Sequence, residues 1–315
     1  MSAGYRFAES KAPLRPVREV QFGICSPEAF AVCKIEYPET IEETTRRPKV
    51  GGLSDMRLGT IDRNFKCQTC GEGMAECPGH FGYLDLARPV YHIGFIGKVK
   101  KILDSGDALV DVLPSVNLQH TDPVFAAIIH ATRGNRMRKK RFQRVWEHCS
   151  KKTICEADPI RDEDDLDFNN EVEAPIGHGG CGHNQPAIRK DGLKLFTQWK
   201  KGKDEDEEAG AKGQVEKKLL PASEAYQILK KMSSEDIDLL GLSEEHARPD
   251  WMIITVLPIP PPPVRPGIVE GGMGKGEDDL TYKLAEVIKA NNSLRQLERE
   301  GVPPHLMSDY ENLLQ

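Results

Sequence analysis

Apolar residues recur at helical spacing between Asp279 and Glu300, near the end of the sequence. Such spacing places them along one stripe of a helix, with charged and polar residues on the opposite face. We therefore predict a long amphipathic helix here, followed after Pro303-Pro304 by another helix. The residues of the predicted apolar stripe are Leu280, Leu284, Val287, Ile288, Leu294 and Leu297.

Shorter helices are predicted in the middle of the chain. From Ile96 to Leu103, lysines alternate with apolar residues, which predicts one helix. From Met137 to Trp146, basic residues interleave with Phe, Val and Trp, which predicts a second helix. Ser223 and Ser234 are predicted to cap two further short helices, and Gly241 to end the second.

The predicted strands are few and separated by irregular segments. Glu19–Ile24 is predicted to be a strand that leads into a short helix at Pro27, and Trp251–Leu257 a buried strand. The proline run that follows, Pro258–Pro266, predicts an extended polyproline segment, and Gly267–Gly276 a flexible loop. These elements together predict an irregular α+β fold with long loops.

Charge and hydropathy narrow the possible functions. The formal net charge is −6, so any contact with nucleic acid needs a local basic patch. The chain shows no signal-peptide core and no apolar run of about 18 residues, which predicts a protein that neither spans a membrane nor enters the secretory route. Asp162–Glu173 and Lys200–Lys212 are charge runs and are predicted to be solvated loops.

The chain contains 8 cysteines, whose clustering with His and Gly favours metal ligation over disulfides. Cys67 and Cys70 supply a C-x-x-C pair, and Cys77-Pro-Gly-His80 supplies a second pair at knuckle spacing. Together they predict one tetrahedral Zn²⁺ site. Four protein ligands leave no open position, so the site is expected to be structural. No His-x-Glu sequence occurs, which argues against a zinc deaminase.

A series of short motifs, from about Val17 to Gln315, resembles the start of the largest subunit of eukaryotic RNA polymerase II. The motifs are Gly51-Gly52-Leu53-Ser54-Asp55, Ile61-Asp62-Arg63-Asn64, Cys67 to Gly82, Phe142 to Trp146, Gly179 to Gly182, Gln185 to Gly192, Arg248 to Met252, Pro260 to Pro266 and Gly276 to Thr281.

In that family this region forms the clamp, a mobile module that closes over the DNA and the DNA–RNA hybrid. The resemblance implies DNA, the hybrid and the other RNA polymerase II subunits as partners, and the nucleus as location. It implies a clamp core with the zinc knuckle over 1–95, a more helical clamp head over 96–195, a charged linker over 196–220 and a return of the clamp core over 221–315. The stretch Pro260 to Gly267 would lie at or beside the lid, a loop that helps to separate RNA from template.

The family's clamp also carries a second zinc, bound by a C-x-x-C pair and two later cysteines that match Cys149 and Cys181. The pair is expected just after Lys101, where this sequence has no cysteine. We therefore predict that the second zinc is lost, unless other ligands replace the missing pair. The candidate substitutes are Cys155, His148, His178 and His183.

Polymerase chemistry is expected only in the full-length enzyme. The family's Asn-Ala-Asp-Phe-Asp-Gly-Asp loop, which holds the catalytic Mg²⁺, does not occur in these residues, so no catalytic residue is assigned. The chain is predicted to be one part of a nucleotidyltransferase and inactive alone. The alternative is a truncated, non-enzymatic zinc-containing module that binds nucleic acid or polymerase partners.

The densest basic cluster coincides with the predicted helix near Trp146. Clustered Arg and Lys neutralise phosphates without reading sequence, which predicts contact with nucleic acid. A solvated helix face is the alternative. Cys25 and Cys33, away from both predicted sites, are expected to be buried thiols. The candidate contact residues are Arg136, Arg138, Lys139, Lys140, Arg141 and Arg144.

Overall fold

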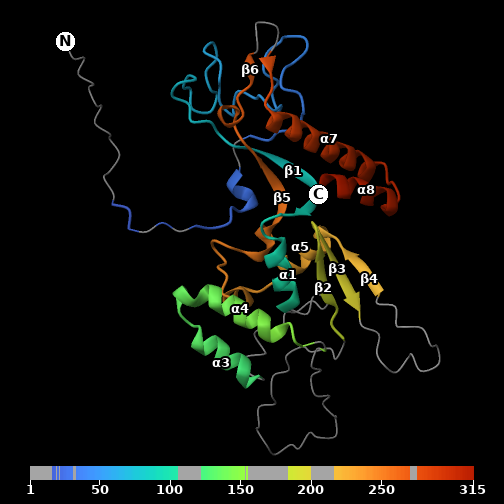
Figure 1. Cartoon of the computed structure of the whole chain (residues 1–315). Coiled ribbons are helices and arrows are strands. Elements are labelled where there is room, and N and C mark those ends of the chain that lie inside the picture. Colours follow the sequence, from blue (N-terminus) through green and yellow to red (C-terminus); the bar gives the residue numbers. More distant parts are fainter. Residues whose placement is uncertain are drawn as a thin grey trace, which may run out of the picture.

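The structure is a computed structural model that describes residues 16–18, 20, 22–30, 33–105, 122–152, 154, 184–199, 216–269 and 275–315. Both predicted charge runs and the candidate ligands Cys155, His178, Cys181 and His183 lie outside these residues. The described part mixes helices with small antiparallel sheets, which confirms the predicted irregular α+β fold (Figure 1). None of its helices combines the length and apolar character needed to cross a membrane.

A two-stranded ribbon joins the two hydrophobic cores. Strand β1 (Gly82–Tyr91) pairs antiparallel with β5 (Ile253–Ile259), and the register shifts between Asp85 and Val90. Figure 1 shows the ribbon running from α7, α8 and the N-terminal loops at one end towards α1, α4 and the three-stranded sheet at the other. Because β1 and β5 contribute side chains to both cores, the ribbon fixes one core against the other.

The smaller core lies beneath helix α7 (Asp279–Arg299). Buried Ile288 and Leu294 confirm the predicted apolar stripe, whereas Leu280 is 51% exposed and was wrongly assigned to it. The helix begins after Asp278, whose carboxylate accepts a hydrogen bond from the Leu280 N–H. This core gathers Cys33, Ile35, Leu53, Leu58, Leu84, Ile259 and Ile288.

Most helices and one sheet surround the larger core. The hydroxyl of Tyr91 at the end of β1 donates to the carbonyl of Leu220 at 3.0 Å, which ties the ribbon to this sheet. The predicted helices near Ile96 and Trp146 are confirmed as α1 and α4. The elements are α1 (Ile96–Ser105), α3 (Pro123–Ala131), α4 (Arg138–Cys149), α5 (Ala222–Lys230), α6 (Ser234–Leu239) and the antiparallel sheet of β2 (Ala187–Asp191), β3 (Lys194–Trp199) and β4 (Glu216–Leu220).

The predicted strand over Glu19–Ile24 is wrong for the described residues of that range, which are irregular. Tertiary contact replaces strand pairing there: the Ile24 N–H donates to the carbonyl of His246 at 2.7 Å. The short helix predicted after it is confirmed as a 3₁₀ helix, η1 (Pro27–Phe30).

Two predicted helix caps are displaced. Ser223 lies inside α5, and the cap of α6 is Ser233, whose hydroxyl accepts from the Asp236 N–H at 3.2 Å. The predicted end at Gly241 is confirmed, since this residue has a φ of 74°.

The proline-rich stretch is only partly extended. After β5, Pro262–Val264 forms a 3₁₀ helix, η6, which the fixed φ of proline permits. The loop predicted over Gly267–Gly276 contains a short antiparallel pair, β6 (Ile268–Val269) and β7 (Lys275–Gly276).

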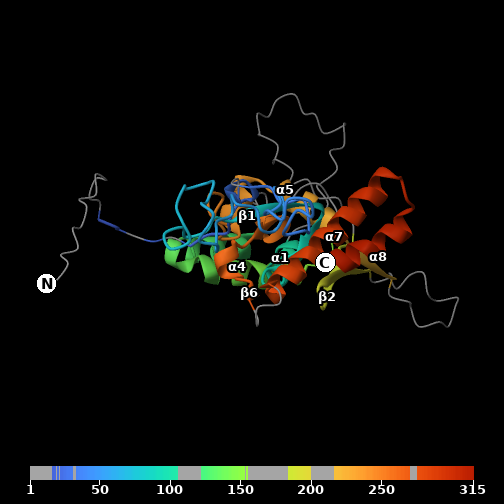
Figure 2. The ribbon, with the colours of Figure 1, turned by 90° about the horizontal axis from the view of Figure 1, so that it is seen from above.

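The register shift in β1 is held by side chains from α7. The buried amide of Asn291 accepts from the Ala87 N–H at 2.7 Å and donates to the carbonyl of Asp85 at 3.0 Å. Arg88 also forms ion pairs with Glu298 of α7 and with Glu311 of α8 (Pro304–Leu314). Figure 2 shows α7 and α8 side by side. At the register shift, the amide of Asn291 therefore forms the hydrogen bonds to the backbone of β1 that β5 does not form there.

Candidate metal centre

The four predicted zinc ligands come together in the loop that precedes β1. One ligand atom from each of Cys67, Cys70, Cys77 and His80 lies within 4.8 Å of the other three. Cys67 and Cys77 are buried, His80 is half-buried and Cys70 is exposed. The cluster therefore stands at the edge of the loop, with one thiol towards solvent.

Two turns bring the ligands to one point. The Gly71 N–H donates to the carbonyl of Cys67 at 2.9 Å, and the Cys77 N–H donates to that of Gly73 at 2.9 Å. Gly71 and Gly79 have φ of 75° and 82°, a region in which other residues are strained. The sequence places glycine where each turn requires it.

Backbone donors favour the thiolate of Cys67. Burial opposes its ionisation, but the N–H groups of Cys70 and Thr69 face the sulfur and hold the pKa of Cys67 below its ordinary value. Donors of this kind orient ligands and offset the negative charge of zinc-bound thiolates.

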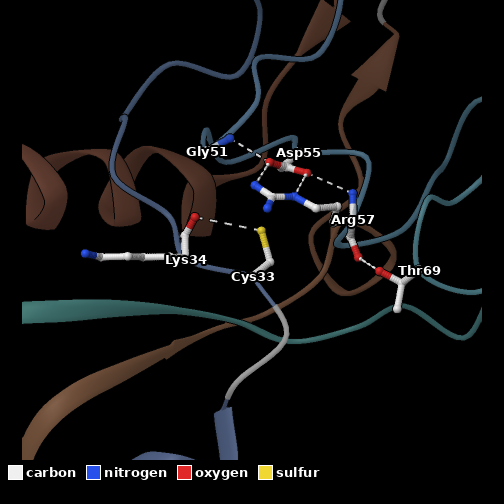
Figure 3. A network of polar contacts seen from close by, with 6 residues as sticks. All are labelled: Cys33, Lys34, Gly51, Asp55, Arg57 and Thr69. Carbon is white, nitrogen blue, oxygen red and sulfur yellow. Dashed lines mark hydrogen bonds and ion pairs between the residues drawn. The ribbon is translucent and has the colours of Figure 1, made fainter.

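An ion pair between buried Asp55 and half-exposed Arg57 supports the loop from one side (Figure 3). Arg57 Nε and Nη2 donate to the two carboxylate oxygens of Asp55 at 3.0 and 2.7 Å, and the Thr69 hydroxyl donates to the carbonyl of Arg57 at 2.6 Å. Burial would raise the pKa of Asp55, but Arg57 and the Gly51 N–H hold it below its ordinary value. Since Thr69 lies between two ligands, this network fixes the first ligand pair.

The donor set fits a closed Zn²⁺ site. With Zn–S of about 2.3 Å and Zn–N of about 2.0 Å, a tetrahedron separates S from N by about 3.5 Å. The Cys77 Sγ and His80 Nε2 atoms are 3.8 Å apart, close to this value. These residues would hold the ion through three thiolates and one imidazole, and the ion would crosslink the loop without taking part in catalysis.

The other described cysteines do not join a ligand cluster. Burial and the nearby Asp55 raise the pKa of Cys33 to about 11, and burial raises that of Cys149 to about 11. Cys25 is exposed, so its predicted burial is wrong, whereas that of Cys33 is confirmed. His148 is hydrogen-bonded to Asp122 at 2.8 Å. The predicted loss of the second zinc stays a prediction, because Cys181 lies outside the described residues.

Most candidate phosphate-binding residues are exposed, but Arg141 is not. Its side chain is 5% exposed; Nε and Nη2 donate to the carbonyl of Thr132, and Nη1 to that of Asp238. Arg141 therefore links α4 to α3 and α6, and the prediction that it contacts nucleic acid is corrected. Arg138 is half-buried and donates to the carbonyl of Leu242. The exposed residues of the set are Arg136, Lys139, Lys140 and Arg144.

Replacing Arg141 by methionine is expected to lower the free energy of unfolding by about 1–2 kcal/mol, because carbonyl groups at Thr132 and Asp238 lose their donors. Removing a buried charge offsets part of this loss. Urea denaturation measures the change, with Lys140→Met as the matched exposed control. Equal stability of the two variants would contradict the buried role.

Sequence reasoning missed the support of the loop by Arg57 and Thr69. The spacing of Asp55 and Arg57 was a usable signal, since residues two apart in a turn can pair through a side chain. Nothing in the sequence linked Thr69 to Arg57.

The comparison with known families agrees with the geometry. A family model described as RNA polymerase Rpb1, domain 1, matches residues 14–315, almost the whole chain. This match includes the Cys₃His cluster, both cores and the ribbon between them. The chain therefore belongs to the RNA polymerase Rpb1 domain 1 family, the N-terminal region of the polymerase's largest subunit.

Proposed function

We propose that this chain is the clamp portion of the largest subunit of DNA-directed RNA polymerase II, and that it helps to hold DNA and the DNA–RNA hybrid in the nucleus. Membership of the family supports the polymerase assignment. The motifs from Gly51 to Thr281 support the assignment to polymerase II. Nucleotidyl transfer belongs to the assembled enzyme, with its Mg²⁺ held outside these residues.

The proposed division of labour follows the order of segments along the chain. The smaller core and the Zn²⁺ loop would belong to the clamp core, over 1–95 and 221–315. Helices α3 and α4 would belong to the clamp head, over 96–195, joined to the rest by the linker over 196–220. The larger core would be shared by the two parts, because α5 and α6 contribute to it together with α1 and α4. The other polymerase II subunits are the proposed protein partners.

The observation that carries the nucleic-acid role is the exposed basic surface of α4 and the turn before it. Arg136, Lys139, Lys140 and Arg144 expose their side chains there, and Lys140 and Arg144 lie one helical turn apart. The chain as a whole is acidic, with a net charge of −6, so the positive surface is local. Such a surface attracts the phosphate groups of DNA without reading its sequence.

Charge reversal tests this surface in the assembled polymerase. Changing Lys139, Lys140 and Arg144 to glutamate is expected to weaken DNA retention at least about tenfold near 0.1 M salt. It is also expected to reduce the slope of log affinity against log salt by about 2–3, since each phosphate contact contributes about 0.9. The measurement is the lifetime of the DNA complex over a salt series.

A matched control reverses three exposed lysines on other elements: Lys217 and Lys218 of β4, and Lys230 of α5. If both triple variants alter the salt slope equally, the effect is one of net charge and the proposed surface is wrong. An unchanged DNA lifetime in the α4 variant would also refute the contact.

A further inference from the structure

The proline-rich segment contains a buried cation, Arg265, which is 2% exposed. Its three nitrogens donate to three separate parts of the chain. Nε donates to the carbonyl of Pro260 at 2.9 Å, Nη1 to the hydroxyl of Thr281 at 3.1 Å, and Nη2 to the carbonyl of Leu53. One side chain thus joins the segment to the start of α7 and to the turn before the zinc loop.

All three acceptors are neutral, so the guanidinium is not held by a contacting carboxylate in these bonds. A buried charge is costly unless its geometry provides strong hydrogen bonds. The planar guanidinium offers five N–H donors in a fixed arrangement, which a single ammonium does not. The position therefore uses the shape of arginine to bridge three segments.

The zinc loop supports the same segment next to Arg265. A Cβ atom added to Gly79 would lie 2.8 Å from ring atoms of Pro261, so the two residues are in close contact. Pro261 and Pro262 are buried, whereas Pro263 and Val264 are exposed. The segment rests on the zinc loop mainly through Pro261.

An open pocket of about 200 Å³ borders the later part of the segment. Its lining includes Pro262, Arg265 and Gly267, together with Thr60 and Phe65 of the loop around the zinc ligands. On this side the segment is not packed closely against the loop, so the three hydrogen bonds of Arg265 make the link.

We infer that Arg265 is a positioning residue, which holds Pro260–Gly267 in a fixed position against the zinc loop and the start of α7. The inference rests on the proposed function, and on the resemblance that would place this segment at or beside the lid, the loop that helps to separate RNA from template. While Arg265 holds the segment, the exposed residues Pro263 and Val264 stay in one position. Without the hydrogen bonds of Arg265, the position of these two residues is no longer fixed.

The test uses the assembled polymerase carrying Arg265→Met, with Arg299→Met, at an exposed arginine near the end of α7, as the matched control. The readout is the amount of RNA that stays annealed to the template behind the active centre, measured by ribonuclease H cleavage. Loss of the three bonds is expected to raise this fraction about fivefold. Arg265→Lys keeps the charge but not the planar set of donors. Its annealed fraction is expected to lie between those of Arg265→Met and the unchanged enzyme.

A second variant keeps the inference testable if Arg265→Met fails to assemble. Thr281→Val removes one acceptor and is expected to raise the annealed fraction about twofold. Normal RNA displacement in Thr281→Val, or in an assembled Arg265→Met enzyme, overturns the positioning role. Zinc content, measured in parallel, is expected to stay unchanged, whereas a merely structural defect would lower it together with assembly.

Failure of the proposed function would look different. A variant with glycine at residues 262–264 alters the segment itself. If it displaces RNA normally, the lid-like role is wrong. If it fails to displace RNA while Arg265→Met succeeds, the lid-like role stands and the role of Arg265 is wrong.

Discussion

Replacing Cys70 by serine is expected to abolish zinc binding and to unfold the loop from about Arg63 to Tyr83. A serine hydroxyl does not replace the thiolate, and the remaining ligands are too few for a closed site. Metal binding supplies folding energy here, on the order of 10 kcal/mol for structural zinc in small domains. Metal analysis is expected to show one zinc per chain in the unchanged protein and none at this site in the variant. Limited proteolysis is expected to show that the loop, resistant in the unchanged protein, is cleaved in the variant.

The structure offers a control for general thiol loss. Cys25 is exposed and stands apart from the cluster, so Cys25→Ser is expected to retain zinc and protease resistance. Unaltered zinc content and loop resistance in Cys70→Ser would show that the cluster is not a metal site. Because Pro261 contacts Gly79, cleavage in the zinc-free loop is expected to extend to the proline-rich segment.

Replacing Asn291 by alanine is expected to lower the free energy of unfolding by about 2–4 kcal/mol. Asn291 is 0% exposed, and its amide satisfies the Ala87 N–H and the carbonyl of Asp85 where the register of β1 shifts. The Ala87 N–H would be left without this acceptor, and a buried unsatisfied group costs about 1–3 kcal/mol. Arg295 still donates to Asp85, which limits the loss on that side.

The neighbouring Asn292 provides the control. It is exposed and donates to the carbonyl of Glu36 at 3.1 Å, so Asn292→Ala is expected to cost no more than about 0.5–1 kcal/mol. Chemical denaturation of the two variants under one set of conditions gives the difference. Equal destabilisation would mean that the amide of Asn291 does not hold the shifted register.

The zinc cluster was predictable from sequence because its information is local. Both ligand pairs and the turn glycines lie within the range Cys67–His80, and spacing alone brings the sulfur atoms together. The helices α1, α4 and α7 were predictable for a similar reason. Their apolar periodicity is a property of the segment, and each buries apolar residues at the predicted spacing, although exposed Leu280 of α7 and buried Arg141 of α4 depart from it.

The sequence-based predictions were wrong where a contact with a residue far away in the sequence decides the local structure or the burial of a side chain. Glu19–Ile24 has a strand-like pattern, but the end of this range is bound by the carbonyl of His246. Arg141 looked like its basic neighbours, yet it alone turns towards Thr132 and Asp238. Residue type predicts the charge of a side chain, and only the packing of other elements decides whether that charge meets solvent.

The ribbon also sets an order of events during synthesis. All four zinc ligands leave the ribosome within one short stretch, from Cys67 to His80. Strand β5, by contrast, follows β1 by roughly 160 residues, about 10–30 s at ordinary rates of translation. Neither core is complete until β5 arrives, so the nascent chain exposes the apolar side chains of β1 for that time. A chaperone or an early partner subunit has its longest opportunity to bind there.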